Sequence, residues 1–262
     1  MKDAIDDMRK GDVHIVIWTE THFEQKHSID FEKIAQERGY NTYSITRLMR
    51  RYDTGSGGVT IMVDKQHTSR EMRRSELEDL IWVRVEVGRE KMFVGGVYLV
   101  PGSSTRKGKA REIIEKEIGG DIARFTQEGH VVLAGDWNCK IGRLASIVGG
   151  REFDRRNTSR RADTRGRKVV ELMNRSDMVI LNGIRGSTAQ DTYDGPRGGS
   201  VNDYIAVSRG VVDKTSNIEY RLDLKNLLHT DHCGLACTIR LEGNGEVKNE
   251  HRGETGVKAS GI

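Results

Sequence analysis

The chain alternates between short apolar runs and polar stretches that contain glycine, asparagine or charged residues. The runs are rich in valine, isoleucine and leucine, and apolar runs of this length and composition are typical of β-strands. They lie at residues 13–18, 59–63, 80–87, 92–100, 131–134, 178–181, 201–208, 218–224 and 231–241. This pattern predicts a protein built largely on β-sheets.

Residues 80–87 show the clearest alternation. Apolar residues occupy the odd-numbered positions from 81 to 87, and aromatic or charged residues stand at the even-numbered ones between them. A strand with this pattern has two different faces. The three residues 88–90 (Gly-Arg-Glu) connect it to the run at 92–100, and so short a connection favours a β-hairpin.

Helical spacing predicts four helices between these strands. They cover Lys2–Lys10, Phe31–Arg38, residues 107–127 and Lys168–Arg175. In the third, isoleucines and a phenylalanine recur at intervals that place them on one face. The Gly119-Gly120 pair inside it predicts a break or a bend.

Strands and helices follow one another in mixed order, with several hairpin-like connections. This order favours layered α/β architecture with mixed sheets over one doubly wound sheet. The sequence contains no glycine-rich phosphate loop of the nucleotide-binding types. Because residues 243–262 are too polar to bury, we predict one domain over residues 1–242 followed by a disordered tail or linker.

Composition narrows the class of protein. Of the 262 residues, 35% are hydrophobic and 31% charged, and no apolar run approaches the roughly 20 residues that span a bilayer. The charged N-terminus does not fit a signal peptide. Cys139, Cys233 and Cys237 are too few for a disulfide framework, and the spacing of the last two lacks the second pair that a zinc site needs. We expect a soluble, intracellular protein, nuclear or cytoplasmic, with buried thiols.

Residues 151–168 form the most basic stretch of the chain, which carries a formal net charge of +4. We expect a long loop there, leading into the helix that begins at Lys168. Two interpretations are open: a solvated loop with surface salt bridges, or a contact to a phosphate backbone, where each basic side chain releases counterions. The candidate phosphate contacts are Arg155, Arg156, Arg160 and Arg161.

Polar residues stand at the ends of two strands that are far apart in sequence. Gly135-Asp136-Trp137-Asn138 follows the run at 131–134, and Thr230-Asp231-His232 begins the run at 231–241. Strand ends are common positions for sites, because a rigid sheet there meets adaptable loops. Carboxylates, an amide and an imidazole suit a hard cation such as Mg²⁺, with Mn²⁺ as an alternative, and a phosphate substrate.

An ordered series of such residues runs along the chain: Glu20, Tyr98, Asp136, Asn138, Asp203, Asp231 and His232. The series resembles that of the endonuclease/exonuclease/phosphatase family, which includes deoxyribonuclease I, apurinic endonucleases and endonuclease domains of non-LTR retrotransposons. The similar motifs are residues 18–22, 135–138, 200–205 and 230–232, and the resemblance covers about residues 12–241. The retrotransposon branch is the most similar, through residues 166–172, 181–183 and 191–193.

The resemblance implies a four-layer sandwich in which two packed mixed β-sheets are flanked by helices. It also implies roles for the residues of the series. Glu20 and Asp231 would hold the metal ion, directly or through water, and Asp136 would orient or deprotonate the attacking water. Asn138 and Tyr98 would hydrogen-bond phosphate oxygens.

The resemblance further implies that His232 contacts the scissile phosphate or serves as acid or base, with Asp203 fixing its tautomer and raising its pKa. Thr192 would touch phosphate or a neighbouring ligand. The chain departs from the family in two ways: the first strand of the family, which carries an asparagine near the metal, is not found ahead of the first helix, and Thr230 stands where serine is usual.

These observations predict a Mg²⁺-dependent phosphodiesterase that nicks DNA, in the manner of a retrotransposon endonuclease domain. We expect a monomer, with a reverse transcriptase domain as a partner in a longer polyprotein. Two alternatives stay open. One is a phosphatase or phosphodiesterase of the same fold that acts on a lipid or a small phosphate. The other is a truncated, inactive remnant that binds nucleic acid.

Overall fold

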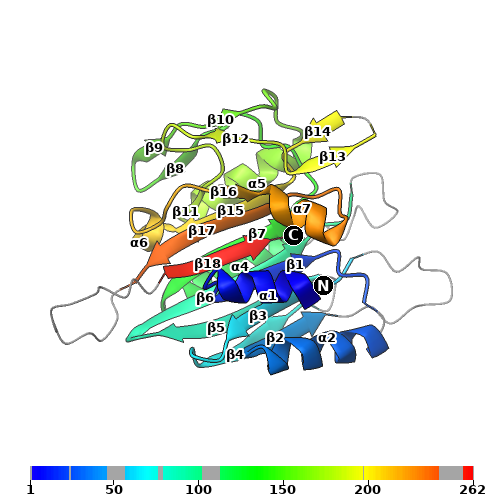
Figure 1. Cartoon of the computed structure of the whole chain (residues 1–262). Helices are drawn as coiled ribbons and strands as arrows, with labels where there is room; N and C mark the ends of the chain where they lie inside the picture. Colours follow the sequence, from blue (N-terminus) through cyan, green and yellow to red (C-terminus); the bar gives the residue numbers. More distant parts are fainter. Residues whose placement is uncertain are drawn as a thin grey trace, which may run out of the picture.

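The structure is a computed structural model of the chain, and it describes residues 2–23, 25–45, 57–75, 79–101, 113–196, 198–241 and 256–261. Two six-stranded mixed sheets pack face to face, and helices cover their outer faces (Figure 1). The four layers agree with the α/β sandwich that the sequence predicts. The site described below lies where strands of both sheets end.

The first sheet, called sheet A, has the strand order β16-β17-β18-β1-β3-β2. Its strands are β1 (Ile15–Thr19), β2 (Tyr40–Ile45), β3 (Val59–Asp64), β16 (Glu219–Arg221), β17 (Gly234–Arg240) and β18 (Gly256–Gly261). Helices α1 (Lys2–Lys10), α2 (Gln25–Glu37) and α7 (Leu222–Leu228) contribute to the smaller hydrophobic cluster on its outer side.

The second sheet, called sheet B, has the order β11-β15-β7-β6-β5-β4. Its strands are β4 (Ser69–Arg74), β5 (Leu80–Val87), β6 (Glu90–Tyr98), β7 (His130–Asp136), β11 (Met178–Ile180) and β15 (Asp203–Ser208). Its helices are the π-helical turn η1 (Ile113–Ile118), α4 (Gly119–Phe125), α5 (Thr164–Arg175) and the short α6 (Arg209–Val212).

Three two-stranded ribbons complete the described fold. They pair β8 (Ser146–Val148) with β9 (Arg151–Phe153), β10 (Arg156–Asn157) with β12 (Thr188–Ala189), and β13 (Tyr193–Gly195) with β14 (Gly198–Ser200). The segment 151–168, expected as one basic loop, therefore contains two short strands and the start of α5. This helix begins earlier than expected, because the Asp163 carboxylate accepts a hydrogen bond from the Gly166 amide and caps it.

Strand β1 shows why its sequence is apolar at every position. Ile15 and Ile17 belong to the large hydrophobic cluster between the sheets. Val16 and Trp18 belong to the second cluster, with α1 and α2, on the outer side of sheet A. Successive side chains of a strand point to opposite faces, so a strand covered on both sides reads as a continuous apolar run.

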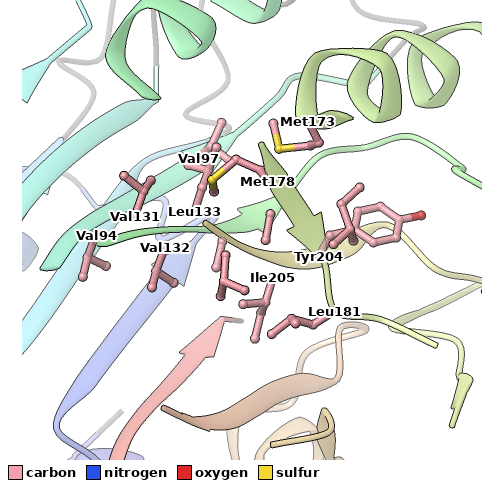
Figure 2. Packing of buried hydrophobic residues seen from close by; sticks show 14 of the residues in the cluster. Val94, Val97, Val131, Val132, Leu133, Met173, Met178, Leu181, Tyr204 and Ile205 are labelled. Atoms are coloured by element: carbon pink, nitrogen blue, oxygen red, sulfur yellow. The ribbon is translucent and has the colours of Figure 1, made fainter. Parts of the chain in front are cut away.

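Strand β7 has the same double burial in sheet B (Figure 2). Leu133 points toward Met173 of α5 and Met178, whereas Val132 and Ile205 point to the other face of the sheet, toward sheet A. β7 pairs with β6 over seven residues and with β15 over five, and this continuous pairing on both sides fixes its register. The end of β7, where Asp136 stands, is therefore held rigidly.

Most predicted elements are present, and the hairpin between β5 and β6 is confirmed. One assignment is wrong at its end: residues 218–224 were expected as a strand, but the strand stops at Arg221 and helix α7 follows. Arg221 hydrogen-bonds Asp7 of α1 and Asp223, a contact with a distant residue that periodicity does not reveal. The predicted helix at 107–127 lies in part outside the described residues, and its described part divides at Gly119 into η1 and α4.

The polar tail also differs from the expectation of disorder, because residues 256–261 form β18. This strand lies between β1 and β17, parallel to the first and antiparallel to the second (Figure 1). The backbone hydrogen bonds of two neighbouring strands are what hold so polar a segment in a sheet. Among the described residues, no helix is long and apolar enough to cross a membrane.

Candidate active site

Three polar side chains stand in one row across neighbouring strands of sheet B. Tyr98 on β6 is the Cα partner of Asp136 on β7, and Asp136 is the partner of Asp203 on β15. All three are buried, with relative exposures of 1, 1 and 2%. The row lies at the last residue of β6, the last of β7 and the first of β15, so it marks one edge of the sheet.

Gly135 is needed at this edge because β7 approaches β6 closely there. A Cβ atom at Gly135 would lie 1.9 Å from the carbonyl oxygen of Val97, and the backbone has φ +145°. Both the space and the dihedral angle exclude other residues. The glycine of the 135–138 motif therefore lets the strand end with Asp136 in its place.

Asn138 holds the Asp136 carboxylate. Its backbone amide donates to Oδ1 of Asp136 over 2.8 Å, and its side-chain amide donates to Oδ2 over 2.7 Å. Asn138 has φ +43°, a conformation that asparagine tolerates better than most residues. The predicted contact of Asn138 with phosphate remains a prediction, whereas its bond to Asp136 is present in the structure.

Glu20 reaches this edge from the other sheet. It follows β1 directly and has φ +51°. The Tyr98 hydroxyl and the Glu20 carboxylate are hydrogen-bond partners, which joins sheet A to the row on sheet B. The next residues are fixed as well, because the amides of Thr21 and His22 donate to the carbonyls of Gly58 and Gly57.

His232 completes the group. Its Nδ1 lies 3.0 Å from Oδ2 of Asp203, and its ring packs against Tyr193 at 5.1 Å between centroids. Tyr193 and His232 also form an isolated β-bridge, so the backbone before β17 is tied to β13. A carboxylate on one imidazole nitrogen fixes the ring orientation and leaves the second nitrogen for chemistry.

Three ligand atoms at this edge lie close enough together to hold a metal ion. Among the described residues, Glu20, Asp136 and His232 each offer one atom, and these atoms lie within 4.8 Å of one another. The Glu20 and Asp136 carboxylates supply oxygen ligands of the kind that a hard divalent cation takes. The residues present therefore fit the metal that the sequence resemblance implies.

The electrostatics of the corner favour a positive charge. Burial, together with the neighbouring Asp203 carboxylate, raises the pKa of Asp136 well above its ordinary value. Burial by itself would lower the pKa of His232, but Asp203 outweighs it and, with Asp136 and Glu20, raises that pKa to about 9. Burial raises the pKa of Tyr98 too, so its hydroxyl stays protonated. His232 is thus a cation at neutral pH.

A pocket of about 410 Å³ opens over this corner. Its lining residues are Thr19, Glu20, His22, His229, Thr230, Asp231 and His232. Asp231 is exposed at the pocket and lies outside the compact group of ligand atoms. Sequence reasoning missed His22 and His229; their only signal was proximity to the two acidic motifs, and both have positive φ.

Two predicted substrate contacts are structural instead. Arg155 is only 4% exposed, and its guanidinium donates to the carbonyls of Leu144, Asn182 and Ile180 and to the Ser146 hydroxyl. Burial lowers the pKa of Arg155 to about 10. Its place inside the fold corrects the expectation of a phosphate contact.

Thr192 is the second correction. It is 1% exposed, and its hydroxyl oxygen accepts hydrogen bonds from the backbone amides of Asn202 and Asp203. It therefore positions the start of β15, and with it the partner of His232. A direct contact with substrate would require an exposure that the side chain lacks.

Arg156, Arg160 and Arg161 are exposed. The last two lie beside the loop after Asp136, because a Cβ at Gly142 would meet the backbone of residues 160–162 at 2.6–3.0 Å. Arg165 donates to the Asn138 carbonyl over 3.1 Å, so the same basic segment also braces this loop. The structure thus brings residues 160–162 and Arg165 beside the loop that follows Asp136, which sequence spacing alone did not establish.

Comparison with known structures agrees with this geometry. The chain is similar to the endonuclease domain of TRAS1, a telomere-specific non-LTR retrotransposon, with 14% identity, a TM-score of 0.55 and coverage of 87% of this chain and 99% of that one. It is similar to a 3′ phosphatase from Neisseria bound to a product DNA hairpin, with 13% identity, a TM-score of 0.67 and coverage of 91% and 94%.

An AP endonuclease from Archaeoglobus fulgidus is also similar, with 15% identity, a TM-score of 0.61 and coverage of 90% of this chain and 93% of that one. No family model and no curated protein matches the sequence. The structural similarities nevertheless show that the chain has the deoxyribonuclease I-like fold of the endonuclease/exonuclease/phosphatase proteins, as the ordered motifs predicted.

Proposed function

We propose that this protein is a metal-dependent phosphodiesterase that nicks DNA. The observation that supports the proposal best is the meeting of Glu20, Asp136 and His232, from two different sheets, beneath an open pocket. Structural similarity to a 3′ phosphatase, an AP endonuclease and a retrotransposon endonuclease domain is consistent with this reaction class. Mg²⁺ is the proposed ion, with Mn²⁺ as an alternative.

The side chains of the site have different proposed roles in the reaction. Asp136, oriented by its two bonds from Asn138, is the proposed acceptor for the proton of the attacking water. His232, held by Asp203 and positively charged, donates from its other nitrogen to a phosphoryl oxygen. These groups start at fixed positions, so little reorganisation is needed during the reaction.

Glu20 would hold the metal ion, and Asp231 at the pocket would support it directly or through water. A divalent ion bound there would polarise the phosphoryl group and stabilise the leaving oxygen. Tyr98 hydrogen-bonds Glu20 and stays neutral, so it keeps that carboxylate oriented. We propose these roles for Glu20, Asp231 and Tyr98 alongside those of Asp136, Asn138, Asp203 and His232.

The basic segment favours DNA over a lipid or a small phosphate. Arg160 and Arg161 lie beside the loop that carries Asn138, and their side chains are exposed to a long polyanion. Each contact with backbone phosphate adds affinity that falls with salt. We propose further that the protein acts as a monomer and is joined to a reverse transcriptase in a longer polyprotein.

The proposal is tested by plasmid nicking with Mg²⁺, comparing the native protein with Asp136→Ala and His232→Ala. We expect each substitution to lower the nicking rate by about 100-fold or more, since each removes a proton-transfer or charge-stabilising group. His27→Gln, which changes an exposed residue of α2, is the matched control and should keep the native rate.

Other outcomes separate the alternatives. Equal nicking by all four proteins would reject these site residues. Salt-dependent DNA binding without any Mg²⁺-dependent cleavage by the native protein would reject the enzyme and support the inactive remnant. Faster hydrolysis of a phosphoinositide than of duplex DNA would favour the lipid alternative.

A further inference from the structure

Two buried imidazoles stand at the opposite end of β1 from the catalytic pocket. His14 immediately precedes β1, and His67 lies in the turn after β3. Their relative exposures are only 3 and 8%, and their ring centroids are 5.1 Å apart with an interplanar angle of 69°. Glu20 follows the other end of β1, so five strand residues, about 17 Å, separate the two places.

One ring nitrogen of His67 is hydrogen-bonded, and the other has no hydrogen-bond partner. The Glu86 backbone carbonyl is a hydrogen-bond partner of the ring. Nε2 is buried and has no hydrogen-bond partner in the structure. A histidine whose second nitrogen is held by a carbonyl while the first is unpaired has the arrangement found in metal ligands. A buried unpaired nitrogen is otherwise costly.

The spacing of the two rings agrees with a shared ion. With Zn–N bonds of about 2.0–2.1 Å, each ring centroid lies about 3.2 Å from the metal, and a tetrahedral angle then places two centroids about 5 Å apart. Asp12 supplies an adjacent carboxylate, since its Oδ1 lies 3.6 Å from Nε2 of His14. The Asp12 side chain is 78% exposed, so it can turn toward an ion without unpacking the core.

A further carboxylate near the two imidazoles, that of Asp64, has other hydrogen-bond partners. Asp64 accepts hydrogen bonds from the Arg9 guanidinium and from the Gln66 amide. It therefore neutralises Arg9 and shapes the turn that carries His67.

We propose that His14, His67 and Asp12 form a second metal site, for a first-row transition ion such as Zn²⁺, separate from the catalytic pocket. Imidazole ligands select this class of ion over Mg²⁺. The ion joins the start of β1 to the turn after β3, and through His67 to β5 of the other sheet. Its role is structural: it stabilises the folded chain.

The test removes metal binding at the catalytic pocket first. In the full chain carrying Glu20→Gln and Asp136→Asn, Zn²⁺ is titrated in competition with a chromogenic chelator, and Co²⁺ binding is followed by visible absorption. We expect one equivalent of Zn²⁺, tetrahedral Co²⁺ bands and a higher melting temperature with Zn²⁺. His67→Gln in the same background should weaken Zn²⁺ binding by about 100-fold and abolish the shift in melting temperature.

Two more variants keep the test decisive. Asp12→Asn changes an exposed side chain, so it should leave the fold intact and weaken Zn²⁺ binding by about 10-fold. His27→Gln should change nothing. The proposal is overturned if the background protein binds no Zn²⁺, or if Zn²⁺ binds equally well after both His67→Gln and Asp12→Asn. If His67→Gln does not fold, unchanged binding by Asp12→Asn is sufficient to reject the site.

Discussion

Asp136 and Asp203 are directly opposed Cα partners on the antiparallel strands β7 and β15. Two carboxylates at such a position repel each other, and both are almost fully buried. The structure offsets the repulsion by placing His232 against Asp203 and the Asn138 amides against Asp136. The pair therefore makes this edge of sheet B a place where positive charge is stabilised.

The first prediction concerns the imidazole that Asp203 holds. The pKa of His232 is about 9 in the folded protein, above the usual value of 6.5, so Asp203→Asn should lower it. Because the folded pKa is the higher one, the stabilising contribution is complete below about pH 6.5 and is lost as the pH rises through 9. This contribution to the free energy of unfolding is on the order of 3 kcal/mol.

This is measured by NMR titration of His232 and by urea unfolding at several pH values, both in EDTA to keep the protein free of metal. Native and Asp203→Asn proteins should differ most in unfolding free energy below pH 6.5 and converge above pH 9. An unchanged His232 titration in the variant would show that Asp203 is not the source of the shift.

The second prediction concerns the backbone of the 135–138 motif. Gly135→Ala places a Cβ against the Val97 carbonyl and should lower the free energy of unfolding by about 3 kcal/mol, with loss of activity. Gly120→Ala is the matched control: a Cβ there meets nothing within 4 Å, and alanine favours the helix by about 0.5–1 kcal/mol. Chemical denaturation compares the two, and equal stabilities would contradict the close-approach argument.

The third prediction concerns β18. Ala259 pairs with Ile15 of β1 on one side and Cys237 of β17 on the other. Ala259→Pro removes the amide donor from an interior strand and should destabilise the protein by about 3 kcal/mol. Because β1 leads to Glu20 and β17 follows His232, activity should fall with it.

Hydrogen exchange of the β1 and β17 amides gives the local readout for this variant. Those amides should exchange faster in Ala259→Pro and at the native rate in Ala259→Val, which keeps the donor. Unchanged protection in the proline variant would mean that β18 does not hold the two strands together.

The fourth prediction separates two kinds of arginine in the basic segment. Arg155→Met leaves buried carbonyls without donors and should lower stability by about 3 kcal/mol or more. Arg161→Ala should leave stability unchanged, weaken DNA binding and reduce the dependence of binding on salt by about one phosphate contact. Thermal unfolding and DNA titrations at several salt concentrations distinguish them. Equal effects of the two variants on both measurements would show that the buried Arg155 and the exposed Arg161 do not have different roles.

The sequence by itself located strands such as β1 and β7, because a strand buried on both faces must be apolar throughout. It did not predict the edge strands β2 and β4, whose residues are more polar and less buried. It also located the acidic motifs, since only a few polar residues follow such runs directly. Cys139, Cys233 and Cys237, expected to be buried thiols, are buried and form no disulfide among the described residues. The layered fold followed from the order of elements.

Only the tertiary structure decided which of these residues meet. Glu20 and Asp136 lie on different sheets, and their distance depends on how the sheets pack, which local pattern does not encode. Arg155 and Thr192 are buried where they hydrogen-bond backbone carbonyls and amides that are distant in sequence. Exposed and internal side chains therefore occur within the same basic or polar stretch. The position of β18 likewise depends on the backbone of β1 and β17, because its own side-chain pattern does not call for burial.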